Sequence, residues 1–404
     1  MDFIWPALNV RRWRLKMKDS NNKFLNSLKG FTGSDAFHSI LSAVMCAVVG
    51  IIVGFLILLI INAEHAPKAI SVILKNFMYY RSVGKRWYYL GQTLVKAVPL
   101  ILCGIGVLFA YKSGLFNIGI AGQYCIGIGV SLWTSLAWHL PWFACLLLAV
   151  LCAAIWAALA GLLKAFCNVN EVIAGIMLNW IGLYLVNVLM QNEKVMNIGK
   201  SETYSIRQNS PQSLLPTLGL GKFFHDNEYV SIAVPLMILV AVVIYIILKR
   251  TVLGYELRAT GLNKHAAKYA GMKDKKNLIL TMVVSGAIAG LGAALYYLTD
   301  IQPWKTSSVV PGMGFNGIAV AFLGALNPIG VIFAGFFIQH ITQGGSFIDT
   351  KYFNPQIADL ISSIIIYSCA FMFLFKTFIA KVISERKNKA EKEKTDSTAA
   401  GAKA

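Results

Sequence analysis

The sequence predicts an all-α polytopic membrane protein, and this prediction depends on its composition and on the length of its apolar runs. The chain has 404 residues, is 57% hydrophobic and only 14% charged, and has a mean hydropathy of +0.62. Soluble proteins carry about 25% charged residues. The apolar residues fall in blocks of about 17–25, the length at which a helix crosses a hydrocarbon core of roughly 30 Å. Short alternating strands of the barrel type are absent.

About ten membrane-spanning helices follow from these runs. We expect them at 39–62, 93–111, 117–138, 142–163, 172–190, 230–248, 277–298, 313–326, 328–344 and 357–380. The eighth and ninth are short for full crossings. Residues 39–380 then form the membrane domain, with a basic segment at 1–38 before it and a charged tail at 381–404, predicted to be disordered, after it.

The net charge of +19 lies in loops and tails, as the positive-inside rule predicts, and this argues against a nucleic-acid partner. With both termini in the cytoplasm, the cytoplasmic segments hold 25 of the 37 lysines and arginines. Segment 63–92 is then external, and its mixture of aromatic and basic residues suits an interfacial helix or a plain loop equally well. The external loop at 191–229 is long and polar, and we expect it to cover part of the outer mouth.

Motifs for catalysis and for metal binding are missing from the sequence. The seven cysteines lie in apolar runs without CxxC spacing, which predicts buried, inert thiols. The segment Gly199-Lys200-Ser201 is not a phosphate-binding loop, because Lys194 stands where the first glycine is needed. We therefore expect no enzyme and no cofactor in this chain, which would not hydrolyse a nucleotide by itself.

Two glycine-rich segments resemble each other, Phe116–Ala121 and Phe315–Ala319, and each opens a predicted span after a break. In the topology above they enter the membrane from opposite sides, which is typical of inverted repeats around a pathway at the midplane. Chance similarity between glycine-rich helices is the alternative.

Polar side chains within spans are costly in lipid and need partners, and most of those in this chain are amides. No span centre carries an obvious set of acids and bases, which argues against an ion-coupled pump. An amide-lined pathway with aromatic residues suits a neutral polar solute. Hydrogen bonding between helices explains any single amide at least as well. The candidate pathway residues are Phe116, Asn117, Gln123, Asn179, Phe315 and Asn316.

The basic segment 249–276 separates two apolar runs and carries eight lysines and arginines against two acids. Residues 262–270 lack glycine and proline and are expected to form two helical turns. Asn263 is placed to cap their start and Gly271 to supply a left-handed stop. The positive-inside rule explains the charge of this segment, but it does not explain a short helix bracketed by glycines.

The same segment carries a family resemblance. The pattern Gly254-Tyr-Glu-Leu-Arg-Ala-x-Gly261-x-Asn263-x-x-Ala266-x-x-Tyr269-Ala-Gly271 resembles the permeases of bacterial ABC importers for nucleosides, within the simple-sugar and branched-chain amino-acid permease group. Further matches are Gly114-Leu-Phe-Asn-Ile-Gly119 with Gly122-Gln123, Asn170-Glu-Val-Ile173 with Asn179, Ser285–Gly292, and Gly314-Phe-x-Gly317-Ile-Ala-Val-Ala-x-Leu-Gly324. The family often has an acid at the position of Asn316.

The resemblance implies a type II-like importer permease of about ten spans with inverted repeats, in the bacterial cell membrane. Its implied partners are a second permease copy or paralogue, a cytoplasmic ABC ATPase and an external solute-binding lipoprotein. We predict that the chain moves nucleosides inward; a simple-sugar permease and an ATP-independent channel or facilitator are the alternatives. The residues implied in ATPase coupling are Glu256, Arg258, Gly261, Asn263, Ala266, Tyr269 and Gly271.

Overall fold

The computed structural model describes residues 35–372, 374–379, 381–382 and 385, so the predicted N-terminal segment and charged tail lie almost wholly outside the described residues. The chain divides into two compact units, one of residues 49–369 and one of residues 1–48 with 370–404. The described part of the second unit is helical. It contains the first half of α2 (Asp35–Ile61) and most of the 3-10 turn η4 (Cys369–Phe371).

Each predicted apolar run contains a helix, so the chain is polytopic and all-α as expected. Six helices in the described part of the chain are long and apolar enough to cross a membrane: α2 from Leu41, α4 (Val83–Lys112), α6 (Trp142–Cys167), α7 (Glu171–Met190), α10 (Ala233–Arg250) and α13 (Asp274–Tyr297). Four are shorter: α5 (Ile120–Leu136), α14 (Gly312–Leu323), α15 (Pro328–Gly344) and α16 (Ile357–Ser368).

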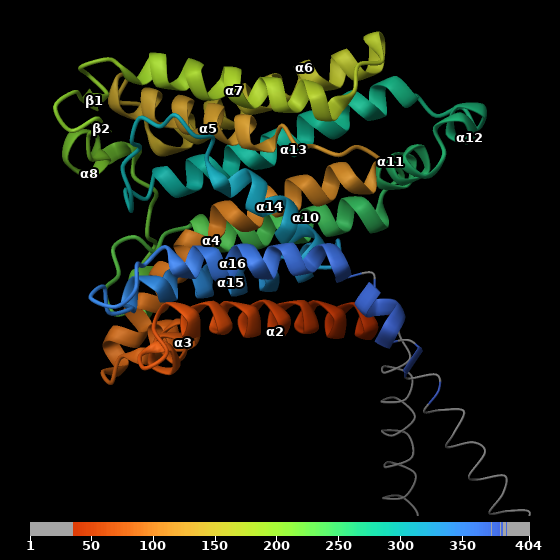
Figure 1. Cartoon of the computed structure of the whole chain (residues 1–404). Coiled ribbons are helices and arrows are strands. Elements are labelled where there is room, and N and C mark those ends of the chain that lie inside the picture. Colours follow the sequence, from red (N-terminus) through yellow and green to blue (C-terminus); the bar gives the residue numbers. More distant parts are fainter. Residues whose placement is uncertain (1–34, 373, 380, 383–384, 386–404) are drawn as a thin grey trace, which may run out of the picture. The chain divides into compact units, whose positions relative to one another are not determined.

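Short elements connect these helices. Strands β1 and β2 pair antiparallel, with Met196 opposite Thr203. The connecting elements are α3 (Ala66–Lys75), η1 (Asn76–Tyr79), β1 (Met196–Asn197), β2 (Glu202–Thr203), α8 (Ile206–Asn209), η2 (Pro211–Ser213), α9 (Leu220–Phe223), α11 (Val252–Leu262), α12 (Lys264–Tyr269) and η3 (Gly345–Phe347). Within residues 49–369, α11 and α12 lie at one end of the long helices, and α3, α8 and the strands lie at the other (Figure 1).

Helix α13 lies at the centre of the larger unit, because its small residues let neighbouring helices approach closely. A Cβ added at Gly290 would lie 2.5 Å from Ala153 Cβ and 2.8 Å from the Ala149 carbonyl oxygen, both on α6. On another side of α13, a Cβ added at Gly127 of α5 would lie 2.7 Å from Gly290 Cα. Small residues allow such close approach in lipid, where packing replaces the hydrophobic drive between helices.

Several predicted boundaries differ from the structure, and two of the differences have a clear physical cause. Helix α4 begins at Val83 rather than at 93, because its first turns pack against residues 224–230: Trp87 makes an edge contact with Phe224, and Gly91 lies against Val230. The aromatic segment 63–92, predicted to be external, is therefore divided mainly between α3, η1 and the first three turns of α4. Helix α14 ends at Leu323, since Ala325 and Leu326 both adopt left-handed backbone angles.

The predicted external loop at 191–229 is an ordered structure. The carboxylate of Asp300, in the connection after α13, accepts hydrogen bonds from Ser205 Oγ at 2.5 Å and from the backbone N–H groups of Ile206 and Arg207 at 3.0 and 3.2 Å. These bonds satisfy the free N–H groups at the start of α8. The segment is thus tied to the connection between α13 and α14.

Candidate functional site

The connection between α4 and α5 holds a buried amide pair. Asn117 Nδ2 donates to Gln123 Oε1 at 2.9 Å and to Ser285 Oγ at 2.8 Å, and Gln123 Nε2 donates back to Asn117 Oδ1 at 3.1 Å. Ser285 Oγ in turn donates to the Gly106 carbonyl at 2.8 Å. Asn117 is 1% exposed and Gln123 2% exposed. An unpaired amide in an apolar interior costs several kcal/mol, and this closed set of bonds removes that cost.

Asn179 on α7 supports the same connection from the other side. Its Oδ1 accepts a hydrogen bond from the Gly122 N–H at 2.7 Å, and its Nδ2 donates to the Ile118 carbonyl at 3.0 Å. The first N–H groups of a helix have no partner inside the helix, so Asn179 supplies one of the missing acceptors at the start of α5. Gly175 and Gly119 allow α7 to come this close, because a Cβ at Gly175 would lie 2.7 Å from the Gly119 nitrogen.

The structure therefore brings together three of the six predicted pathway residues, Asn117, Gln123 and Asn179. The hydrogen-bonding atoms of all three amides have partners within the protein. Phe116, beside them, is half-buried. The predicted residues of the second segment lie elsewhere: Phe315 is 42% exposed, and Asn316 is exposed as well. A role for any of the six in solute passage stays a prediction.

The two Phe-Asn segments nevertheless come together where Gly314, next to Phe315, lies against Ala121. A Cβ at Gly314 would lie 2.4 Å from Ala121 Cα, and a Cβ at Gly317 would lie 2.7 Å from Cys103 Cβ. The glycine side of α14 thus packs on α5 and α4, and Phe315 and Asn316 are left on its open side. Phe116 and Asn117 precede α5, whereas Phe315 and Asn316 lie within the first turns of α14, and the inverted repeat stays a prediction.

The basic segment after α10 is two capped helices, where a loop with one short helix was predicted. Thr251 Oγ1 accepts a hydrogen bond from the Gly254 N–H at 3.1 Å and caps α11, which the sequence did not predict. The predicted caps of α12 are confirmed: Asn263 Oδ1 accepts from the Ala266 N–H at 3.0 Å, and Gly271 has φ +81° just after the helix. Propensity alone did not reveal α11, because its sequence contains two glycines and a threonine.

The predicted coupling residues form an exposed surface along these two helices. Tyr269 is 95% exposed, and Ala266 and Gly271 beside it are exposed as well. On α11, Arg258 is exposed and Glu256 is half-buried. Leu262, the last residue of α11, is 90% exposed as well, so apolar side chains of both helices face solvent.

Replacing Asn263 with alanine is expected to loosen α12, because loss of the side-chain cap costs about 1 kcal/mol of helix stability. Six residues are too few for a helix to be stable alone. Hydrogen exchange at Ala266 to Tyr269 should accelerate severalfold, whereas Asn192→Ala, which removes a similar turn bond to the Lys194 N–H, should leave these amides unchanged. Equal exchange in Asn263→Ala and the parent protein would contradict the capping role.

A cavity of ≈ 560 Å³ is lined by residues of both predicted sites. Phe116 comes from the α4–α5 connection, and Arg258 and Gly261 come from α11. Lys112 and Glu171 also line it, and Glu171 forms an ion pair with Lys164 at 2.8 Å. The coupling surface and the start of α5 are therefore neighbours, which the sequence did not predict.

A second polar cluster lies between η1 and α15, and two of its members, His340 and Gln343, are polar residues of a predicted span. Asn76 Nδ2 donates to the His340 carbonyl at 2.9 Å, and His340 Nε2 lies 3.0 Å from the Leu74 carbonyl oxygen. Nearby on α4, Lys96 Nζ donates to Gln343 Oε1 at 2.8 Å. Lys96 falls within a predicted span, so its charge could have indicated this cluster from the sequence. Among the residues that the structure describes, no group of three His, Cys, Asp or Glu side chains is placed to hold a metal ion.

This arrangement defines a multi-pass helical transport subunit. The chain belongs to the family described as the permease component of the branched-chain amino acid transport system, which matches residues 89–370. It is a permease subunit of an ABC transporter, a transport component rather than an enzyme.

Three relatives show how similar the chain is to known permeases. It is 33% identical over 300 residues to the guanosine ABC transporter permease protein NupP of Bacillus subtilis, covering 73% of this chain and 84% of the relative. It is 33% identical over 320 residues to the nucleoside ABC transporter permease protein NupB of Lactococcus lactis, covering 76% and 85%. It is 30% identical over 306 residues to the glucose ABC transporter permease protein TsgB13 of Haloferax volcanii, covering 74% and 80%. No solved structure matches the chain.

Proposed function

We propose that this permease moves nucleosides into a bacterial cell, using ATP that a partner subunit binds with Mg²⁺ and hydrolyses. The observation that carries the proposal is the exposed, doubly capped α11–α12 pair in a chain of this family that has no phosphate-binding loop of its own. The names of the NupP and NupB relatives support a nucleoside as the solute. The absence of an obvious acid–base set at the span centres favours a neutral polar solute.

The proposed orientation places both termini, and the coupling segment 249–276, in the cytoplasm. Within residues 49–369 this segment lies at the opposite end of the long helices from the ordered segment 191–229 (Figure 1). The excess of lysine and arginine in the cytoplasmic segments of this topology supports the assignment. The segment 191–229 would then face an external solute-binding lipoprotein.

The proposed assembly contains an ABC ATPase against α11 and α12, and a second permease, either a copy or a paralogue. Glu256, Arg258, Asn263, Ala266 and Tyr269 would contact the ATPase. The open side of α14, with Phe315 and Asn316, would line the solute path together with the second permease. Movement of α11 and α12 would reach the membrane through α10 and α13, the helices that flank them.

Uptake in vesicles that contain the complete transporter tests the proposal. Radiolabelled nucleoside should accumulate with the active ATPase, and accumulation should fall to the level of empty vesicles with an ATPase variant that binds ATP but cannot hydrolyse it. Accumulation that continues with the inactive ATPase would instead establish an ATP-independent channel or facilitator.

A simple sugar is the second candidate solute, and the relative TsgB13 supports it. Competition separates the two candidates: a large excess of unlabelled guanosine or cytidine should abolish nucleoside uptake, whereas the same excess of glucose should leave it unchanged. Strong competition by glucose alone, with labelled glucose taken up, would overturn the nucleoside assignment.

A further inference from the structure

We propose that the coupling segment acts first on the start of α5, through a backbone contact between Gly261 and Gly114. Gly114 is then a positioning residue for transport that lies outside the coupling segment. This inference rests on the proposed function, in which movement of α11 and α12 reaches the membrane through α10 and α13. We infer that the same movement reaches α5 more directly than either of these helices.

The contact between Gly261 and Gly114 leaves no room for a side chain on either residue. A Cβ added at Gly114 would lie 2.6 Å from Gly261 Cα, and one added at Gly261 would lie 2.6 Å from the Ser113 carbonyl carbon and 2.7 Å from the Gly114 nitrogen. Gly114 also has φ +80°, a conformation that glycine adopts without strain. At this contact backbone lies against backbone, so no side chain separates the two residues.

A second path joins the same part of α11 to the same connection. Asn277 Nδ2 on α13 donates to Thr260 Oγ1 at 3.1 Å, and both residues are buried. Ser285 lies eight residues further along α13, about 12 Å at the rise of an α-helix. It accepts the hydrogen bond of Asn117 at 2.8 Å. Two neighbouring residues of α11, Thr260 and Gly261, are therefore linked to residues 114–117 by one direct contact and one path through α13.

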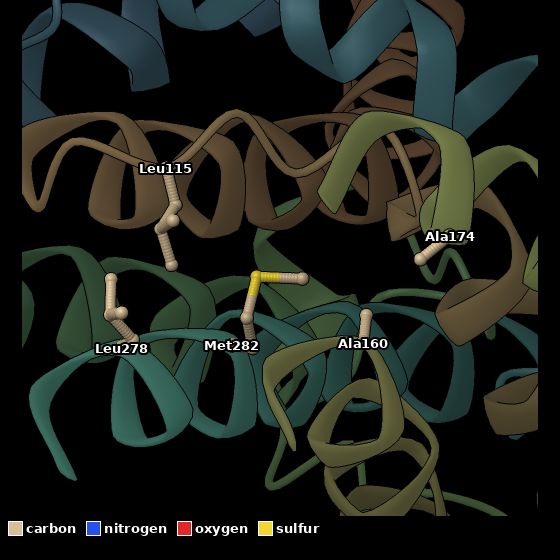
Figure 2. Packing of buried hydrophobic residues seen from close by; sticks show 5 residues of the cluster. All are labelled: Leu115, Ala160, Ala174, Leu278 and Met282. Carbon is tan, nitrogen blue, oxygen red and sulfur yellow. The ribbon is translucent and has the colours of Figure 1, made fainter. Parts of the chain in front are cut away.

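Apolar packing joins the α4–α5 connection to α13. Leu115, next to Gly114, is 2% exposed and belongs to a cluster with Leu278 and Met282 of α13 and with alanines of α6 and α7. Figure 2 shows the side chains of Leu115 and Leu278 pointing toward each other across the space between the connection and α13. Protein interiors are close-packed, so such a cluster moves as a unit rather than yielding locally. The end of α11, the α4–α5 connection and the first half of α13 therefore contact one another in pairs and form a triangle of contacts.

Both sets of contacts lead to the amide pair, Asn117 and Gln123, that fixes the start of α5. Displacement of Gly261 moves Gly114 and Leu115, and displacement of Thr260 moves α13 and Ser285. Both displacements act on Asn117, whose side chain holds Gln123 in the first turn of α5. Small residues on α14 pack on this same turn, so the movement reaches the second Phe-Asn segment next.

The test compares transport with ATP hydrolysis in the complete transporter carrying Gly114→Ala. We expect the complex to assemble and hydrolyse ATP at a rate close to that of the parent, while nucleoside uptake per ATP falls at least about tenfold, the effect of roughly 1.4 kcal/mol on the coupling step. Gly219→Ala is the matched control. Gly219 also has a positive φ, of +77°, but nothing lies within 4 Å of an added Cβ, so uptake per ATP should be unchanged.

Thr260→Val tests the second path with a substitution that keeps the shape of the side chain, and we expect a partial loss of uptake per ATP that adds to the effect of Gly114→Ala. If Gly114→Ala does not assemble, Gly261→Ala tests the same contact from α11, because its added Cβ would lie 2.6 Å from the Ser113 carbonyl carbon. Unchanged uptake per ATP in the assembled variants, or uptake and hydrolysis falling in parallel, would overturn the proposal. Failure of the proposed function is distinguishable, because the parent transporter would then show no ATP-dependent nucleoside uptake.

Discussion

Gly290→Val is expected to leave little folded protein, because Gly290 is pressed between two helices. Its added side chain would meet Ala153 Cβ at 2.5 Å and the Ala149 carbonyl oxygen at 2.8 Å on α6. Helix α5 closes another side, where Gly127 approaches Gly290 Cα. Inserting carbon atoms into a packed core costs about 1–3 kcal/mol where side chains can yield. Here backbone atoms form part of the obstacle, so whole helices must separate and we expect a cost at the top of that range or above it.

The measurement is the yield of monodisperse protein in detergent and its thermal unfolding temperature. Gly312→Val is the matched control, because an added Cβ at Gly312 would meet only Asn316 Nδ2, at 3.8 Å. The control should unfold within a few degrees of the parent, while Gly290→Val should unfold far earlier or fail to accumulate. Equal unfolding temperatures for the two variants would show that α5, α6 and α13 do not pack as described.

The glycines of α13 also show what could be predicted from the sequence. The GxxxG pattern at Gly286 and Gly290 is typical of close helix packing in lipid, and the structure shows such packing against α6. The apolar runs predicted the helices because the length and hydropathy needed to cross a bilayer are local properties of the sequence. The cap at Asn263 was predictable because its bond reaches only three residues along the chain.

Contacts between distant parts of the chain could not be predicted. Asn117 and Ser285 are 168 residues apart, and nothing in either segment indicates the other. The early start of α4 has the same origin, since its aromatic first turns are stabilised by residues 224–230 rather than by their own sequence. Helix α11 is a third case, because its Gly254 and Gly261 lower helix propensity, yet each fits against a neighbouring backbone.

The two Phe-Asn segments were both predicted from the sequence to line the solute pathway, but their asparagines have different surroundings in the structure. The side chain of Asn117 is enclosed, and that of Asn316 is exposed. The similarity of the segments reflects a shared backbone requirement: each needs glycines that let a short helix begin against its neighbours. An asparagine in such a segment can therefore support the fold or face the solute path, and only its environment distinguishes the two.

This difference predicts opposite results for Asn117→Leu and Asn316→Leu. In Asn117→Leu the amide of Gln123 loses its partner while it stays buried, and a buried polar group left unpaired costs about 1–3 kcal/mol. Hydrogen bonds between helices in membrane proteins average only about 0.6 kcal/mol, so the loss of the bond to Ser285 is the smaller effect. In Asn316→Leu no buried partner is left unpaired, and the unfolding temperature should not change.

Transport should separate the two variants further. Asn117→Leu should lose uptake in proportion to the loss of folded transporter, and the protein that remains should bind the ATPase less well because the start of α5 is no longer fixed. Asn316→Leu should assemble fully and raise the nucleoside concentration needed for half-maximal uptake, since an exposed polar group on the proposed solute path is replaced by an apolar one. If Asn316→Leu instead unfolds early while Asn117→Leu keeps its stability, the assignment of the two segments must be reversed. That outcome would place the solute path at the buried amide pair and would require the start of α5 to open during transport.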